Sequence, residues 1–186
     1  MVLRHISSLI CLFILVSQIY DVKDLNCLIK SVNKGWNSAI AVVYSHSQPN
    51  YSVGFARSTF TDKQLEKLKP LVDEIKDLYT FYFMSTWQMY FLFLTCEVKC
   101  SITALDVVNW QNTHSMIIAV RAVIKLFRYV KHKQELHQKI LTFLILYDHR
   151  LMRIYDHYVI IDDDKTTFYH HLIHTFDFTA LNGKEK

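Results

Sequence analysis

YFLFLTCEVK, residues 90–99, is the stretch of sequence that decides the predicted fold. Its first five residues, Tyr90 to Leu94, are all apolar, as is typical of a strand in the middle of a sheet that is covered on both sides. Two charged residues, Glu97 and Lys99, then end the stretch. Because side chains alternate between the faces of a strand, residues two apart point the same way. The stretch therefore predicts a central strand with an acid and a lysine together at its carboxyl end.

A second strand and a long helix flank this central strand in the sequence. Residues 79–84 and 89–99 are rich in aromatic and β-forming residues and predict two strands joined by a turn at 85–88. From residue 104 to about 133, apolar residues recur at helical spacing and predict the longest helix of the chain.

Upstream of the central strand, the pattern predicts two helices and one strand. Residues 21–35 place apolar side chains at helical spacing and predict an amphipathic helix. Alternating apolar residues over 51–55 predict a short strand. Thr61 and Gln64 form a capping box at the start of a helix expected over 62–76.

Downstream of the long helix, three further strands are predicted over 139–147, 151–161 and 167–179. Their connections, 148–150 and 162–165, read as hairpin turns. The segments together predict a mixed α/β (α+β) domain, with a central mixed β-sheet flanked by helices.

Composition indicates one domain over residues 21–186. The 186 residues are 51% hydrophobic, which is enough for one ordinary core, and three Gly with two Pro leave no obvious linker. The chain has no glycine-rich phosphate loop and no Gly-x-Ser-x-Gly elbow. The two enzyme classes that depend on these motifs are therefore excluded.

Residues 1–20 form a separate apolar segment. The run 6–20 follows Arg4 and His5 and has the character of a signal peptide, although no Ala-x-Ala cleavage pattern follows it. A buried N-terminal helix explains the run equally well, so the compartment stays open. At 15 residues the run is too short for a membrane span, and no spanning segment is expected.

The four cysteines, Cys11, Cys27, Cys96 and Cys100, are too few and too unevenly spaced for a disulfide scaffold. We expect reduced thiols in the core. Disulfides stay possible if the chain is exported.

Basic residues gather at and after the end of the long helix, although the net charge of +4 is mild. These residues are Arg121, Lys125, Arg128, Lys131 and Lys133. Such a stripe can face the phosphates of DNA or RNA, or it can be a solvated face that complements the helix dipole. Both interpretations stay open.

Glu97 and Lys99 carry the chemistry that the sequence suggests. An acid at a strand end can ligate a hard cation such as Mg²⁺, and a neighbouring lysine can orient the attacking water and stabilise charge on a phosphate. One acid alone rarely holds Mg²⁺ in a competent geometry. A second oxygen ligand is therefore needed.

Three segments carry a resemblance to a known group of enzymes. Residues 49–55, the strand 93–99 and the following helix with Gln111 resemble the motif order of the PD-(D/E)XK nuclease-like superfamily. Within it, the chain is similar over residues 30–186 to a large uncharacterised fungal domain family with a Pro-Asp-x-x-x-Gly segment. The resemblance implies a restriction-endonuclease-like fold and Mg²⁺-dependent phosphodiester hydrolysis in nucleic acid.

Carried over to this chain, the resemblance implies that Glu97 is a metal ligand, Lys99 the catalytic lysine and Gln111 the residue that orients lysine or water. Asn50 takes the position of a metal-binding aspartate. Because an amide lacks the charge of a carboxylate, we expect impaired or absent catalysis. The domain would then be a degenerate nuclease, and Arg121, Lys125 and Arg128 of the basic stripe would contact the nucleic acid.

Two further expectations complete this interpretation. The similar proteins continue beyond the strand at 176–178 with another helix, so the chain is expected to be truncated and to leave sheet surface for a protein partner. The alternative function is a non-enzymatic interaction or effector-like protein, secreted if residues 1–20 are a signal peptide.

Overall fold

The computed structural model describes residues 25–36, 48–71, 84–98, 105–163 and 165–177. In the first turns of the long helix it describes the backbone only. The segment 1–20, residues 79–83 of the strand predicted over 79–84, Cys11 and Cys100 lie outside these residues. The predictions made for them are therefore not addressed.

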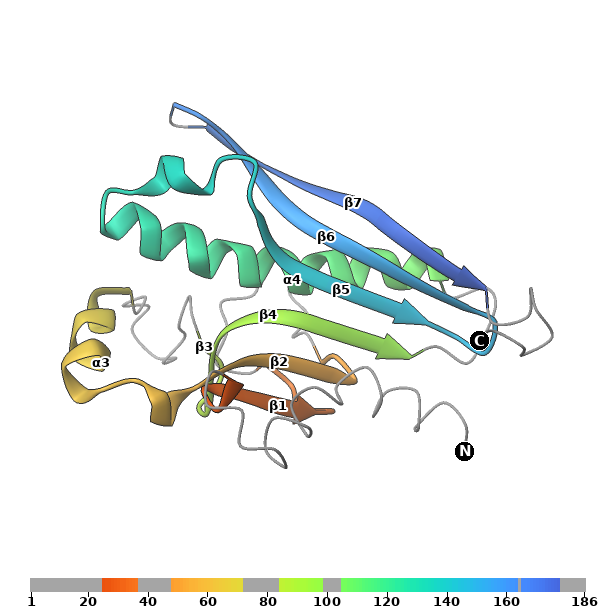
Figure 1. Cartoon of the computed structure of the whole chain (residues 1–186), viewed down its shortest axis with the longest axis horizontal. Coiled ribbons are helices and arrows are strands. Elements are labelled where there is room, and N and C mark those ends of the chain that lie inside the picture. Colours follow the sequence, from red (N-terminus) through yellow and green to blue (C-terminus); the bar gives the residue numbers. More distant parts are fainter. Residues whose placement is uncertain (1–24, 37–47, 72–83, 99–104, 164, 178–186) are drawn as a thin grey trace.

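Within these residues the strands form one mixed sheet (Figure 1). They pair in the order β1-β2-β4-β5-β6-β7, and β3 pairs with β4 off this path. Only β4 and β5 are parallel, so the predicted mixed sheet is confirmed and the class is α+β. The strands are β1 (Leu28–Val32), β2 (Tyr51–Ala56), β3 (Met84–Thr86), β4 (Met89–Val98), β5 (Ile140–Tyr147), β6 (Leu151–Asp162) and β7 (Lys165–Asp177).

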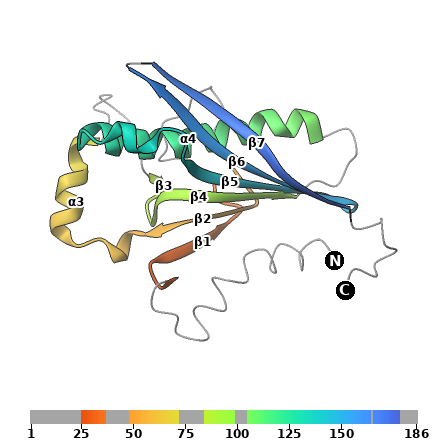
Figure 2. The ribbon, with the colours of Figure 1, turned by 45° about the horizontal axis from the view of Figure 1, so that its top comes forward.

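Two α-helices accompany the sheet in the described part of the chain. Helix α3 (Asp62–Leu68) begins with the predicted capping box, in which the Thr61 hydroxyl accepts from the Gln64 N–H and the Gln64 side chain accepts from the Thr61 N–H. Helix α4 (Leu105–Tyr129) lies across one face of the sheet, against β4 and β5 (Figure 2). Short 3-10 turns are η2 (Arg57–Thr59), η3 (Lys69–Leu71) and η5 (Lys133–Leu136).

The core forms where α4 covers the centre of the sheet. Met116 of α4 is fully buried and packs with Leu92 of β4 and Leu144 of β5. The Thr95 hydroxyl lies 3.5 Å from the Met116 sulfur, so Thr95 points toward α4. β4 is therefore the buried central strand that its apolar sequence predicts, and α4 returns the chain so that β5 can run parallel to it.

The helix predicted over residues 21–35 is wrong where the structure describes it. Residues 28–32 form β1 instead, paired antiparallel with β2 along their whole length. The apolar residues of this segment fit helical spacing, but the edge of β2 presents backbone N–H and C=O groups that need partners. Pairing with β1 satisfies these backbone groups. The local spacing of apolar residues contains no information about this pairing.

The predicted extent of the long helix is also too great at its end. α4 stops at Tyr129, and Lys131 takes a left-handed conformation with φ of 63°, which ends helical backbone. The three C-terminal strands are confirmed within the described residues, as is the turn at 148–150, and Asp162 pairs with Lys165 where the second turn is predicted. Cys96 is buried and Cys27 is partly buried, and these two cysteines form no disulfide with each other. No described helix is long and apolar enough to cross a membrane.

Candidate functional site

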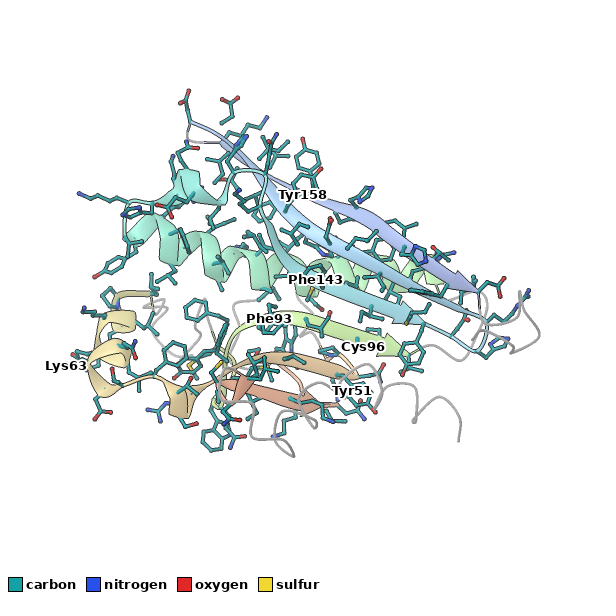
Figure 3. The ribbon with its side chains drawn as sticks, viewed as in Figure 1. Tyr51, Lys63, Phe93, Cys96, Phe143 and Tyr158 are labelled. Atoms are coloured by element: carbon teal, nitrogen blue, oxygen red, sulfur yellow. The ribbon has the colours of Figure 1, made fainter. Side chains whose placement is uncertain are left out.

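The start of β2 lies beside the carboxyl end of β4. Because these strands are antiparallel, Tyr51 lies opposite Cys96 (Figure 3). Asn50 precedes β2, and its side-chain Oδ1 accepts a hydrogen bond of 2.8 Å from the backbone N–H of Val98. The structure thus brings Asn50 to the end of the strand that carries Glu97.

Asn50 is held in this place by Asn33, the residue after β1. The Asn50 Nδ2 donates to the Asn33 Oδ1 at 3.2 Å, and the Asn33 backbone N–H donates to the Asn50 carbonyl at 2.9 Å. Asn33 has a φ of 48°, a left-handed conformation that asparagine tolerates better than most residues. The side chain of Asn50 therefore links the ends of β1, β2 and β4 and stabilises this part of the fold.

Glu97 is buried at the same end of the sheet, with 7% of its surface exposed. Its parallel partner on β5 is Leu146, and the buried Asp148 follows two residues later. β4 and β5 point the same way in Figure 1, so the two acids lie at the same end of these neighbouring strands. The sequence interpretation assigned Asp148 only to a turn. A buried acid after a strand parallel to the central one is the signal that could have singled it out.

Asp148 also performs that turn function. Its Oδ1 accepts the backbone N–H groups of Arg150 at 2.6 Å and Leu151 at 2.7 Å. These bonds close the hairpin between β5 and β6. One carboxylate oxygen of Asp148 is thus already used by the backbone.

The remaining predicted catalytic residues fall partly outside the described chain. Lys99 is not described, and Gln111 is placed only through its backbone, within α4. Among the described residues no three His, Cys, Asp or Glu side chains come close enough together to hold a metal ion. Asn50 offers an uncharged oxygen that already accepts a hydrogen bond. The described donors do not fit a tightly held Mg²⁺, and we derive no step through that ion.

The predicted nucleic-acid contacts do come together, in a groove between α4 and β7. Arg121, Lys125 and Arg128 follow one face of α4 and line a hollow of about 290 Å³. The other lining residues are Ile124 of the same helix and Thr166 and Phe168 of β7. We call this hollow the α4–β7 groove.

One hydrogen bond spans the groove from α4 to β7. The Arg128 Nη2 donates to the Thr166 hydroxyl at 2.7 Å, which links the helix to the edge strand. Phe168 is 38% exposed and leaves an aromatic face in the groove beside the cationic side chains. Cations next to an exposed ring suit a ligand that carries both phosphate and a flat base.

The rest of the predicted basic stripe points elsewhere. Lys133 donates through its Nζ to the carbonyl oxygen of Asp163, in the turn between β6 and β7. Lys131 follows the end of α4 and does not line the groove. The five basic residues, which lie within residues 121–133, therefore separate into two groups. Three line the groove and two lie beyond it.

A buried histidine of β6, His157, lies beside β7, opposite His170. His157 is 3% exposed, and neither ring nitrogen has a hydrogen-bond partner within the described chain. Burial, with a smaller contribution from the neighbouring His170, lowers the pKa of His157 to about 4. The His157 and His170 rings stack with centroids 5.8 Å apart. His157 is therefore neutral at neutral pH.

A larger cavity, about 710 Å³, lies between α4 and the strands β1, β2 and β4 and is lined by apolar side chains and one thiol. Phe55, Phe91 and Phe93 of the sheet and Leu126 of α4 are among its walls. No charged or hydrogen-bonding side chain among its lining residues could orient a reacting group. We assign it no chemistry.

The protein is thus an α+β domain with one mixed sheet, a covering helix and a basic groove beside an exposed edge strand. The chain belongs to the family described as a domain of unknown function, DUF7924, whose model matches residues 1–186. No curated protein and no solved structure matches the chain.

Proposed function

We propose that this protein binds single-stranded nucleic acid in the α4–β7 groove and has lost most of an ancestral phosphodiesterase activity. The observation that carries the proposal is the convergence of Arg121, Lys125 and Arg128 with the exposed ring of Phe168. Lys and Arg bind the backbone of nucleic acids, and aromatic faces stack with unpaired bases.

The groove favours a single strand over a duplex. Its volume of about 290 Å³ is on the scale of one nucleotide, and its aromatic wall belongs to a strand edge rather than to a helix that could enter a major groove. In this binding mode a base stacks on Phe168 and the adjoining phosphates contact the cations of α4. The hydroxyl of Thr166 adds a polar group at the same place.

The relationship to PD-(D/E)XK nucleases is also a proposal. It is supported by the order of elements: β2 antiparallel to β4, then α4, then β5 parallel to β4. It is further supported by the position of Asn50 beside the end of the Glu97 strand. Since Asn50 contributes no charge and serves the backbone of Val98, the proposed catalytic capacity is small.

Replacing Arg121, Lys125 and Arg128 together with glutamine should weaken binding of a single-stranded oligonucleotide by at least about tenfold at low salt. Because fewer counterions are released, the slope of log affinity against log salt should fall by about 2. Fluorescence anisotropy across a salt series measures both quantities. Phe168→Ala should lower the affinity while leaving the slope unchanged.

The matched control removes three cations from elsewhere. Lys63, Lys67 and Lys69 are exposed residues in and just after α3, and replacing them with glutamine makes the same change in net charge. If this control weakens binding as much as the groove variant, binding follows overall charge and the groove proposal is wrong. Tighter binding of duplex than of single strand would overturn the choice of ligand.

Asn50→Asp should raise the affinity for Mg²⁺ by at least about tenfold, because it adds a carboxylate beside the strand that carries Glu97. The variant keeps an oxygen that can accept the Val98 N–H. Titration calorimetry of both proteins with Mg²⁺ measures the gain, and Glu97→Gln in the Asn50→Asp background should remove it. An affinity that does not rise, or a rise that survives Glu97→Gln, would contradict the degenerate-site proposal.

A second candidate function is a non-enzymatic interaction protein. The observation in its favour is β7, whose side chains are mostly exposed and include several large apolar ones. Such a strand offers a surface for a protein partner.

A further inference from the structure

We propose that β7 pairs with the β7 strand of a second copy of this chain, antiparallel and edge to edge, so that the two sheets become one. β7 ends the strand order of the sheet, and among the described residues its only strand partner is β6. An edge strand exposes a row of backbone N–H and C=O groups that can pair with another strand. With 13 residues, β7 is the longest strand of the sheet.

Apart from one bulge, at Ile173, β7 lacks the features by which sheet edges usually avoid such pairing. Between its first and last residues it has no charged residue, no Pro and no Gly. Native edges are commonly protected by an inward-pointing charge, by Pro or by being short. Four large apolar side chains are instead exposed on this strand to between 38% and 44%: Phe168, Tyr169, Leu172 and Ile173.

The opposite edge of the sheet shows the contrast. β1 has 5 residues and carries a lysine, Lys30, in its middle. A short strand with a central positive charge is a poor template for pairing. The two edges of one sheet therefore differ in length, charge and apolar exposure, and only β7 has the character of an interface.

The charges at the ends of β7 identify a second copy as its partner. The strand begins with Lys165 and ends with Asp177, the only charged residues in it. When two copies pair antiparallel about His171, Lys165 of each lies within one residue of Asp177 of the other, at both ends of the interface, because the bulge at Ile173 shifts the register by one. The same register brings Tyr169 beside the bulge at Ile173. Opposite charges and apolar pairs directly across from each other stabilise antiparallel strands.

This pairing keeps the α4–β7 groove accessible and duplicates it. The two-fold axis that relates antiparallel strands in one sheet is perpendicular to that sheet, so facing residues share a side. The α4 helices of the two copies then lie over the same face. The two grooves then lie toward opposite ends of the interface, because each includes Thr166 and Phe168 near the start of its own β7.

The test is a charge exchange measured by sedimentation equilibrium on the full chain, over a wide range of protein concentration. Lys165→Glu alone and Asp177→Lys alone should each weaken the dimer at least tenfold, because each puts like charges at both ends of the interface. The double variant restores opposite charges in reversed order and should recover most of the affinity. Ile173→Lys should give a monomer, and thermal unfolding of each variant shows that it folds.

Each alternative outcome overturns the inference. A natural chain that is monomeric at all concentrations means that β7 does not pair with a second copy. A dimer that tolerates Ile173→Lys uses another surface. A dimer in which the double variant is as weak as the single ones does not have this register. None of these results depends on nucleic-acid binding.

Discussion

Replacing Gly54 with alanine is expected to destabilise the protein by about 3 kcal/mol, enough to leave a domain of ordinary stability partly unfolded. A Cβ at this position would lie 2.8 Å from the Cγ of Met89, 2.9 Å from the Cα of Leu92 and 2.9 Å from the carbonyl oxygen of Tyr90. Two of these neighbours are backbone atoms, which a side-chain rotation cannot move away.

The crowding at Gly54 has its origin in an irregular pairing of β2 and β4. Val53 pairs with Leu94 and Phe55 with Tyr90, so the bulged stretch of β4 passes opposite Gly54. Phe91, within the bulge, has a φ of 42°, which brings the β4 backbone toward β2. The close approach requires a residue without a side chain.

Chemical denaturation of Gly54→Ala beside the natural chain measures the effect. Removing the side-chain neighbour with Met89→Ala in the same chain should not restore stability, because the two backbone contacts persist. Lys63→Ala, on the exposed side of α3, serves as a substitution of no expected consequence. A free energy of unfolding for Gly54→Ala within about 0.5 kcal/mol of the natural value would contradict the bulge geometry.

Acid is expected to destabilise the protein by about 3 kcal/mol through His157 alone. In the unfolded chain an exposed histidine binds a proton near its ordinary pKa of 6.5, whereas burial lowers the pKa of folded His157 to about 4. Between these values the unfolded state binds more protons, so the free energy of unfolding decreases as the pH is lowered. The loss begins below pH 6.5 and is complete below about pH 4.

His157→Leu should remove this part of the acid sensitivity. Its free energy of unfolding, measured by denaturant titration at neutral pH and at pH 4, should change less than that of the natural chain by about the same 3 kcal/mol. His132 is an exposed histidine paired with Glu135, and His132→Gln should keep the acid sensitivity of His157. An identical pH dependence in His157→Leu and the natural chain would show that His157 titrates like an exposed residue.

Several elements follow from local sequence alone. The apolar run of β4, the helical spacing in α4 and the alternation over β5 to β7 each predict their element, because side-chain periodicity reports which faces are buried. The Thr61 and Gln64 capping box is equally local, since its donors and acceptors lie within one turn. In these cases a short segment contains all the information that its backbone uses.

Only part of the candidate site could be predicted from the sequence. The motif order places Asn50 and Glu97 in one site, and the structure brings Asn50 within a hydrogen bond of the next residue, Val98. That Asn50 is also bonded to Asn33 could not be predicted, because the segment before Asn33 was assigned to a helix. Asp148 was missed because its sequence context describes a turn and says nothing of the neighbouring strand.

What the sequence by itself determined is therefore the set of elements that carry their own periodicity, together with the basic face of α4. Tertiary structure alone decided that residues 28–32 form a strand, that Gly54 meets a bulge of β4, and that Arg121, Lys125 and Arg128 share a groove with β7. The physical reason is common to all three. Each depends on backbone or side-chain contacts between segments far apart in the chain, and such contacts override local preference without leaving a local pattern.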